Sequence, residues 1–383
     1  MKTFTNKTFL SIFVIIVLLC SLRVMAQDTK DATKFYNSGV EAEKSENYQD
    51  AVFYYSLAIE VDPNYAEAYY SRGNVNRKVK NYFKAASDYT KAVTINPKYE
   101  AAFLSRGLCY YELKDFTHAM EDFKQVTVIN TKNADAYNYL GLCYFNAKDY
   151  KGAVEAYSHS IDVNPNSPEA YSYRGRAYIE LKDYASAIGD LDKSIEFNPN
   201  SEEFYVNRGI AYLQTMNYEK AANDFNKAIE LNPGYAESYY NKGVAELQFK
   251  DFNAAIGDFT KAIERNSKHT EAYFNRGNAY LELKNFQDAV LDYNKALDLN
   301  PNFEKAINNR GYVYIELKDW ANAINDFSKA VQINPGSAFG FYNLAICYMS
   351  TNNKDKAVEY LKKAAQLGDA DSQDWLKSNG YTW

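Results

Sequence analysis

A strict internal repeat is the feature of this sequence that most limits how the chain can fold. Steps of 34 along the numbering give nine glycines, at positions 39, 73, 107, 141, 175, 209, 243, 277 and 311. The same step gives ten alanines, at positions 51, 85, 119, 153, 187, 221, 255, 289, 323 and 357. Repetition at such a period indicates an array of small units that become stable only when they stack on one another.

Each repeat unit has the pattern of two short helices. In the unit that starts at Thr270, the sequence predicts one helix over about residues 271–283 and a second over about 287–299. Asn285 marks the break, because Asn and Asp tolerate turn geometry and cap the following helix. Asn or Asp occupies this place in every unit, from Asn47 to Asn353. Pro301 then ends the second helix, since the residue before a proline is forced out of the helical conformation.

This unit resembles the tetratricopeptide repeat. The residues that carry the resemblance in the unit from Thr270 are Tyr273, Gly277, Tyr280, Ala289, Tyr293, Ala296 and Pro301. The small Gly277 and Ala289 would allow a close crossing of the two helices, and the tyrosines would fill the space around it. The resemblance implies an all-α, right-handed α-solenoid of helix-turn-helix repeats. It also implies a module that binds proteins or peptides and has no catalysis or cofactor of its own, although one fold serves many partners.

The period predicts the organisation of the whole chain. We expect a signal peptide over residues 1–26, a short lead over 27–31, tandem repeats over 32–371, and a capping helix with its tail over 372–383. Ten repeats are expected, starting at residues 32, 66, 100, 134, 168, 202, 236, 270, 304 and 338. The polar final helix would cover the last exposed face of the array, as solenoids require.

Residues 1–26 have the layout of a secretory signal peptide. A basic start with Lys2 and Lys7 precedes a run of eleven residues, 9–19, that is apolar apart from Ser11 and too short for a comfortable membrane span. Residues 24–26 end on Ala26 and suit cleavage there. We therefore expect an exported protein, periplasmic or secreted. The alternative is membrane attachment through residues 1–26, either by a retained anchor or by a lipid on Cys20.

The charge balance disfavours nucleic acid as a partner. Residues 1–26 hold three cations and no acid, so the remaining chain has 40 Lys and Arg against 49 Asp and Glu. Nucleic-acid binding needs a dense basic face, and adsorption to anionic lipid needs similar charge. The sequence leaves the oligomeric state open.

Seven repeats carry a cation at position 7, and the same seven carry an aspartate at position 23. This concordance predicts a pair within each repeat rather than an anion-binding site. The predicted pairs are Arg72–Asp88, Arg106–Asp122, Arg174–Asp190, Arg208–Asp224, Lys242–Asp258, Arg276–Asp292 and Arg310–Asp326. The repeat with Leu140 replaces the aspartate with Ala156, so both partners are absent there.

No motif for catalysis or metal binding is present in the sequence. The three histidines, His118, His159 and His269, do not share a helix or a ligand-like spacing, so we expect exposed side chains and no metal site. Cys109, Cys143 and Cys347 occupy one packed register, and we expect free, buried thiols. An enzyme with a diffuse carboxylate site remains the least favoured alternative.

In the resembling family, positions 2, 5, 9, 12 and 13 of the first helices form a concave groove. This resemblance implies that the groove binds an extended peptide or an inserted helix. The candidate residues are Tyr70, Asn74, Arg77, Tyr111, Phe145, Arg176, Tyr240, Phe274, Asn278, Tyr312 and Tyr342. Two alternatives stay open: these side chains pack only against neighbouring helices, or the protein is an assembly scaffold that uses its edges and convex face.

Two repeats depart from the pattern. Arg77, Lys78, Lys80 and Lys84 form a local basic cluster, which is either a solvated surface or a place for an acidic partner segment. Glu246 stands where tyrosine is usual, four residues after Lys242, and a local ion pair accounts for it.

Overall fold

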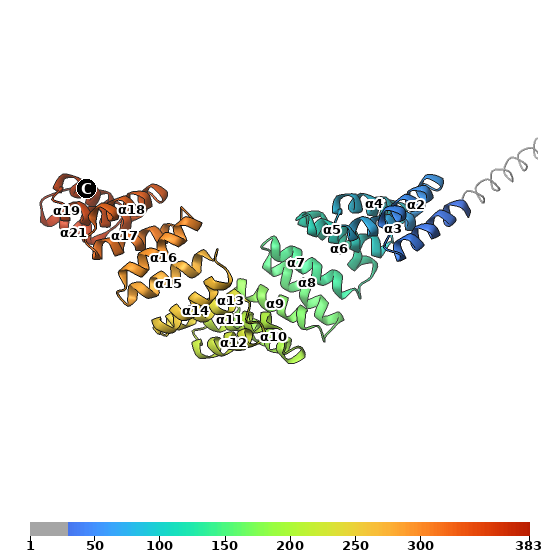
Figure 1. The fold of residues 1–383 in the computed structure, drawn as a ribbon, viewed down its shortest axis with the longest axis horizontal. Coiled ribbons are helices and arrows are strands. Elements are labelled where there is room, and N and C mark those ends of the chain that lie inside the picture. Colours follow the sequence, from blue (N-terminus) through green and yellow to red (C-terminus); the bar gives the residue numbers. More distant parts are fainter. Residues whose placement is uncertain (1–29) are drawn as a thin grey trace, which may run out of the picture. The chain divides into compact units, whose positions relative to one another are not determined.

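The computed structural model describes residues 30–383, which form helices and short turns without any strand. The chain divides into two compact units, one ending at Phe197 and one spanning Asn198–Trp383 (Figure 1). The first unit contains helical residues 30–44, α2 (Tyr48–Val61), α3 (Ala66–Lys78), α4 (Tyr82–Ile95), α5 (Glu100–Glu112), α6 (Phe116–Ile129), α7 (Ala134–Asn146), α8 (Tyr150–Val163), α9 (Pro168–Glu180) and α10 (Tyr184–Phe197).

The second unit repeats the same alternation of 13- and 14-residue helices up to its last members. It contains α11 (Glu202–Gln214), α12 (Tyr218–Leu231), α13 (Ala236–Gln248), α14 (Phe252–Arg265), α15 (Thr270–Glu282), α16 (Phe286–Leu299), α17 (Glu304–Glu316), α18 (Trp320–Ile333), α19 (Ala338–Ser350), α20 (Lys354–Gln366) and α21 (Ala370–Ser378). Among residues 30–383, none of the helices has the length and apolar composition needed to cross a membrane. The predicted signal peptide and Cys20 lie outside the described residues.

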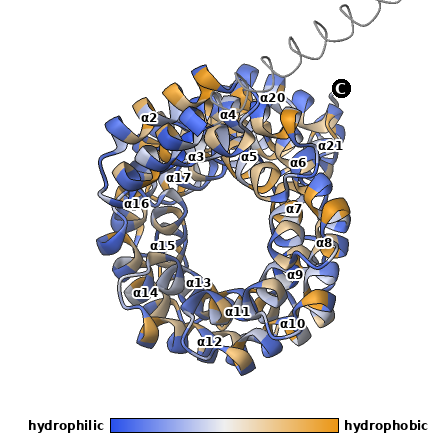
Figure 2. Cartoon of the chain, turned by 90° about the vertical axis from the view of Figure 1, so that its right-hand side faces the viewer, coloured by the Kyte–Doolittle hydropathy of each residue, from blue (hydrophilic) through white to orange (hydrophobic). Residues whose placement is uncertain are grey.

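Within each compact unit, every helix packs against the next helix along the chain. The first helices of successive pairs also touch, for example α5 with α7 and α13 with α15. Each helix carries both hydrophobic and hydrophilic residues (Figure 2), as expected for helices that bury one face. The prediction of an all-α solenoid built from tandem helix pairs is confirmed.

The turn inside each pair places one residue in the left-handed conformation. After α15, the Lys284 N–H donates to the Leu281 carbonyl and the Asn285 N–H donates to the Tyr280 carbonyl, both at 2.8 Å. These two bonds define a Schellman motif, and Lys284 has a φ of 58°. The sequence predicts the break between the two helices at Asn285, whereas the residue in the left-handed conformation is its neighbour, Lys284. Asn285 itself precedes the first residue of α16.

The repeated small residues explain how the two helices of a pair approach each other. A Cβ at Gly277 would lie 2.8 Å from a ring carbon of Tyr293, which is closer than real Cβ contacts. Both Tyr293 and Ala289 are fully buried in the same cluster. Cys109, Cys143 and Cys347 are free and buried, as expected, and burial raises the pKa of the Cys143 thiol to about 12.

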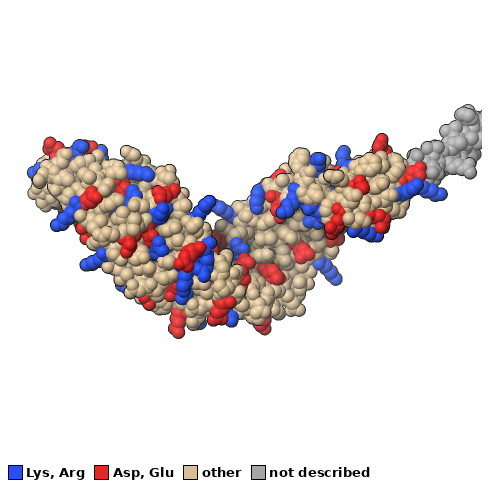
Figure 3. All heavy atoms as spheres, in the orientation of Figure 1, with Lys and Arg blue, Asp and Glu red and all other residues tan. Residues whose placement is uncertain are grey.

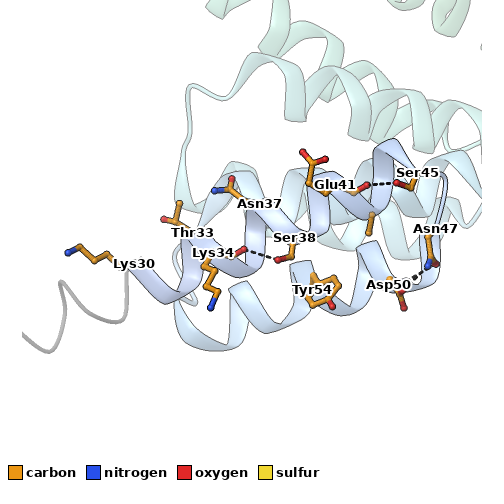
Figure 4. Close-up of a pocket in the computed structure, with 11 residues that line it drawn as sticks. Lys30, Thr33, Lys34, Asn37, Ser38, Glu41, Ser45, Asn47, Asp50 and Tyr54 are labelled. Carbon is orange, nitrogen blue, oxygen red and sulfur yellow. Dashed lines mark hydrogen bonds between the residues drawn. The ribbon is translucent and has the colours of Figure 1, made fainter.

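The two ends of the described chain are covered in different ways. The exposed side of helical residues 30–44 is polar, with Lys30, Thr33, Asn37 and Glu41 along one face (Figure 4). At the other end, α21 packs on α20 and buries Leu376. The outer face of the first helix pair is therefore polar, and that of the last pair is covered, as a stacked array of repeats requires.

Candidate functional site

The seven predicted pairs of basic and acidic residues all lie in direct contact, between the first and second helices of each pair. The arginines make two-point contacts through Nε and Nη2, and Lys242 Nζ lies 2.9 Å from Asp258 Oδ2. The closest distances in the six arginine pairs are 2.7 Å for Arg72–Asp88, Arg106–Asp122, Arg174–Asp190, Arg208–Asp224 and Arg276–Asp292, and 2.6 Å for Arg310–Asp326. These groups therefore belong to the scaffold.

Burial governs the electrostatics of these pairs. The side chain of Asp292 is only 6% exposed and that of Arg276 only 17%. Burial raises the pKa of Asp292 above its ordinary value, and the hydrogen bond and charge of Arg276 oppose this shift. Since each charge is removed from water, loss of one partner would leave the other uncompensated.

The same arginines also connect neighbouring repeats, a feature that the sequence analysis missed. Arg276 Nη1 donates to Thr260 Oγ1 of the preceding helix pair at 2.9 Å. Equivalent bonds join Arg72 to Ser56, Arg106 to Thr90, Arg174 to Ser158 and Arg310 to Asn294. The signal was available, because the preceding repeat has a Ser, Thr or Asn at position 25 in each of these cases.

Three of the aromatic groove candidates pack against the residue that closes their own repeat. The ring of Tyr70 lies 5.0 Å from that of Tyr99, and the ring of Phe274 lies 4.8 Å from that of Phe303. Tyr240 lies 4.6 Å from the imidazole of His269 in the same way. The sequence signal for these contacts is the recurrence of a ring at both position 5 and position 34 of one repeat.

His269 corrects one expectation. We expected all three histidines to be exposed, yet His269 is only 8% exposed, while His118 and His159 are exposed. Its ring packs against that of Tyr240 at a tilt of 38°, and its two nitrogens lie 3.6 Å from carboxylate oxygens of Glu237 and Glu271. The prediction failed because His269 takes the place that Tyr or Phe fills in four other repeats. No metal-binding group of His, Cys, Asp or Glu is found in the part of the chain that the structure describes.

The two groove asparagines act as hydrogen-bond acceptors for buried tyrosines. The Tyr89 hydroxyl donates to Asn74 Oδ1 at 2.7 Å, and the Tyr293 hydroxyl donates to Asn278 Oδ1 at 2.8 Å. Asn309 also donates to Asn278. A buried phenol needs such a partner. The sequence shows this relation, because asparagine at position 9 occurs in repeats that carry tyrosine at position 24.

Three other candidates, Tyr111, Phe145 and Arg176, come together in one cleft of the first compact unit. Its volume is about 190 Å³, and α5, α7, α8 and α9 all contribute to its wall. Four further residues line the cleft but were not predicted from the sequence: Leu142, Asn146, Tyr157 and Tyr173. Leu142 and Asn146 occupy positions 9 and 13, so the groove register points to them even though their identities did not draw notice.

The cleft offers ring faces, an amide and a cation side by side. The Arg176 guanidinium lies 5.2 Å from the centre of the Phe145 ring. Asn146 Nδ2 lies 3.5 Å from the Tyr111 hydroxyl. The Tyr111 hydroxyl is neutral near neutral pH and can form hydrogen bonds, and burial raises its pKa further. Such a set of groups can enclose an aromatic side chain and pair with an acidic group beside it.

The remaining candidates lie elsewhere. Arg77 is exposed, and Tyr312 is 41% exposed in the second compact unit. Tyr342 lines a separate cleft of about 210 Å³ beside α21, together with Met349, Leu361 and Trp375. In the second unit, therefore, Tyr312 and Tyr342 do not line one shared cleft.

Family models for the tetratricopeptide repeat match almost the whole helical region. They match residues 35–65, 66–99, 101–133, 134–167, 156–189, 203–235, 236–269, 270–303, 304–337 and 338–371, and a further TPR repeat model matches 175–215. No curated protein matches the chain.

Several solved structures are similar to parts of this chain. A tetratricopeptide repeat protein from Parabacteroides merdae ATCC 43184 is 18% identical, with a TM-score of 0.51, over 65% of this chain and 99% of that one. YrrB, described as a TPR protein with an unusual peptide-binding site, is 22% identical over 49% and 97%, with a TM-score of 0.44. The yeast Tom70 is 16% identical over 92% and 95%, with a TM-score of 0.43. At 18% identity, the likeness to the Parabacteroides merdae protein concerns the fold alone.

Proposed function

Because the chain carries multiple tetratricopeptide repeats, stacked as a solenoid, we propose that it is a non-catalytic module that binds peptides or proteins through the groove of its first helices. The repeats form the scaffold, and the variable residues on that scaffold select the partner. The proposed array has ten repeats over residues 32–371.

The observation that carries this proposal is the cleft formed by Tyr111, Phe145 and Arg176. Its volume of about 190 Å³ is below the ~300 Å³ at which small-molecule sites begin, so it suits one large side chain of an extended peptide. Partly exposed ring faces next to a guanidinium are typical anchors at protein interfaces. Tyr173 and Tyr157, with ring centres 5.7 Å apart, complete the wall.

The setting is proposed to be outside the cytoplasm. The basic start, the short apolar run and the small residues before Gln27 support a cleaved signal peptide. N-terminal sequencing of the mature protein tests this directly. A start at Gln27 would agree with export and cleavage, a lipid-bearing start at Cys20 would indicate anchoring, and an intact Met1 would contradict cleavage.

The groove function is tested by crosslinking pull-down from cell envelopes. The test variant combines Tyr111→Ala, Phe145→Ala and Arg176→Ala, and the control is Leu291→Ala, which removes an exposed side chain from α16. Circular dichroism and thermal unfolding first establish that both variants remain folded. A groove receptor loses its crosslinked partner by about tenfold or more in the test variant, the equivalent of about 1.4 kcal/mol of binding free energy. An unchanged partner would refute groove binding and favour an assembly scaffold that uses other surfaces.

A further inference from the structure

A polar recess lies over Asn76, on the side of the first compact unit formed by second helices. It has a volume of about 340 Å³, and its walls come from Val52 and Ser56 on α2 and from Lys84, Ser87 and Asp88 on α4. Arg72 and Asn76 on α3 complete the lining. This recess is separate from the cleft around Phe145, to which α2, α3 and α4 contribute nothing.

The recess exists because Asn76 replaces a tyrosine. Position 11 of the repeat is otherwise mostly tyrosine, and the exceptions are Ala42, Asn76 and Glu246. The pocket at the start of the described chain, drawn in Figure 4, includes Ala42 in its lining. Thus in two of the three repeats without this ring, the residue at position 11 lines an opening.

Lysines at the register of Lys84 show what the missing ring changes. Lys220 Nζ lies 5.4 Å from the ring centre of Tyr212, and Lys356 Nζ lies 5.0 Å from that of Tyr348. In both cases the ammonium group covers the tyrosine of its own repeat. Lys84 has Asn76 opposite it instead, so its ammonium group borders an open recess.

The charges already inside the recess leave it net cationic. Asp88 is held at two points by Arg72 and receives a third hydrogen bond from Asn76 Nδ2 at 3.2 Å. That carboxylate is therefore compensated. Lys84 adds a positive charge at the rim, and Ser87 adds a hydroxyl.

The surface beside the recess is also basic. Residues 77–84 contain Arg77, Lys78, Lys80 and Lys84 and no acidic residue. Lys78 is paired with Glu43 at 2.7 Å, whereas Lys80 and Lys84 are exposed. Phe83, next to Lys84, is 78% exposed. A cationic rim with one exposed ring is complementary to an acidic chain that also carries an aromatic residue.

We propose that this recess is a second docking site, which receives a carboxylate side chain from an acidic, aromatic-containing segment of a protein partner. Lys84 pairs with the carboxylate, Ser87 and Asn76 hydrogen-bond to it, and Phe83 packs against the partner's ring. A membrane surface fits less well, because the chain carries 49 acidic against 43 basic residues and mixes both signs over the face shown in Figure 3.

The probe for this site is a fluorescein-labelled peptide of alternating Glu and Phe, and its charge-reversed counterpart alternates Lys and Phe. Binding to the full chain is measured by fluorescence anisotropy. Asn76→Tyr fills the recess with the ring found in other repeats, and Lys84→Glu reverses the charge at its rim. Lys356→Glu is the matched control, since it makes the same charge change at the same register where Tyr348 fills the space.

We expect the Glu–Phe peptide to bind the native chain and to lose about tenfold or more of its affinity in both Asn76→Tyr and Lys84→Glu, while Lys356→Glu changes it by less than about twofold. Thermal unfolding establishes that each variant is folded. Undetectable binding to the native chain, an unaffected Asn76→Tyr variant, or equal losses in Lys84→Glu and Lys356→Glu would each overturn the site. Equal binding of the Lys–Phe peptide would overturn the acidic class of ligand. Binding to phosphatidylglycerol vesicles but not to the peptide would overturn the protein partner in favour of a membrane.

Discussion

Arg276 on α15 holds Asp292 on α16 at two points, with Nε 2.8 Å from Oδ2 and Nη2 2.7 Å from Oδ1. Because both side chains are largely buried, Arg276→Leu strands a carboxylate away from water. We expect this single change to lower the free energy of unfolding by about 3–5 kcal/mol. The double change with Asp292→Ala should cost much less, which a double-mutant cycle in urea unfolding measures.

One repeat of this chain already has hydrophobic residues at both positions of the pair. Leu140 and Ala156 occupy the same two positions and are buried in one hydrophobic cluster with Cys143. A hydrophobic pair is therefore compatible with this packing. Zero coupling between the two substitutions would show that the ion pair contributes nothing specific.

The bond from Arg276 to Thr260 predicts a link between successive repeats. Thr260→Val keeps the shape of the side chain and removes the oxygen that accepts from Nη1. We expect a loss of about 1–2 kcal/mol in the free energy of unfolding, since hydrogen bonds to charged groups are worth more than neutral ones. The loss should disappear in the Arg276→Leu background. Thr94→Val is the control, because the Thr94 hydroxyl donates only within its own helix, and an equal loss there would refute the link.

The helical scaffold could be predicted well from the sequence because it is repeated. Gly277 and the pair of Arg276 with Asp292 recur at the period of the array, and such recurrence shows which positions depend on one another. Aligning the repeats with one another also predicts the helix pairs, and this needs no information about a binding partner. These features are local to one repeat, so a single sequence contains many independent examples of them.

The candidate groove was predicted less well, because it depends on contacts between repeats that vary from one to the next. Phe145 and Arg176 meet across two helix pairs, and nothing in either repeat alone indicates that Tyr157 and Tyr173 close the same cleft. Asn278 was assigned to the groove by register, yet its oxygen accepts from a buried phenol. Register shows which side chains face the groove and not which of them are already occupied.

Two glycines in comparable helices should respond in opposite ways to alanine. A methyl group at Gly277 would meet the Tyr293 ring at 2.8 Å, so we expect Gly277→Ala to cost about 1–3 kcal/mol of stability through overpacking. A methyl group at Gly257 on α14 would meet nothing within 4 Å, and alanine is the better helix former there. Gly257→Ala should therefore add up to about 1 kcal/mol. Thermal unfolding of both variants measures this, and the same sign for both would contradict the packing argument.

Lys284 is a lysine where a glycine would be less strained. Its φ of 58° places it in the left-handed region, which costs a residue with a Cβ about 1 kcal/mol. Lys284→Gly should stabilise the protein by about 0.3–1 kcal/mol, since the greater freedom of glycine in the unfolded chain offsets part of the gain. Lys295→Gly, at an exposed site inside α16, is the control and should lose about 1 kcal/mol. Chemical unfolding that shows equal losses for both would refute strain at Lys284.

Glu246 should make stability depend on pH. Lys242 Nζ lies 3.4 Å from Glu246 Oε1 and 2.9 Å from Asp258 Oδ2, so two carboxylates share one ammonium group. Lys261 lies farther off, 3.8 Å from Asp258, and Glu246 Oε2 is buried without a hydrogen-bond partner. Burial, followed by the neighbouring carboxylate of Asp258, raises the pKa of Glu246 to about 7, while Lys242 opposes the shift.

The sign follows from proton binding. The ordinary pKa of this group is 4.5, so between about pH 4.5 and 7 the folded chain holds a proton that the unfolded chain has released. The stabilisation is therefore complete below about pH 4.5 and is lost as pH rises through 7, by an amount on the order of 2–3 kcal/mol. Glu246→Gln keeps a neutral side chain, so the difference in unfolding free energy between it and the native chain should grow from pH 5 to 8.5. Glu264→Gln, at an exposed carboxylate, should show no such trend, and a constant difference for Glu246→Gln would mean that Glu246 is charged throughout this range.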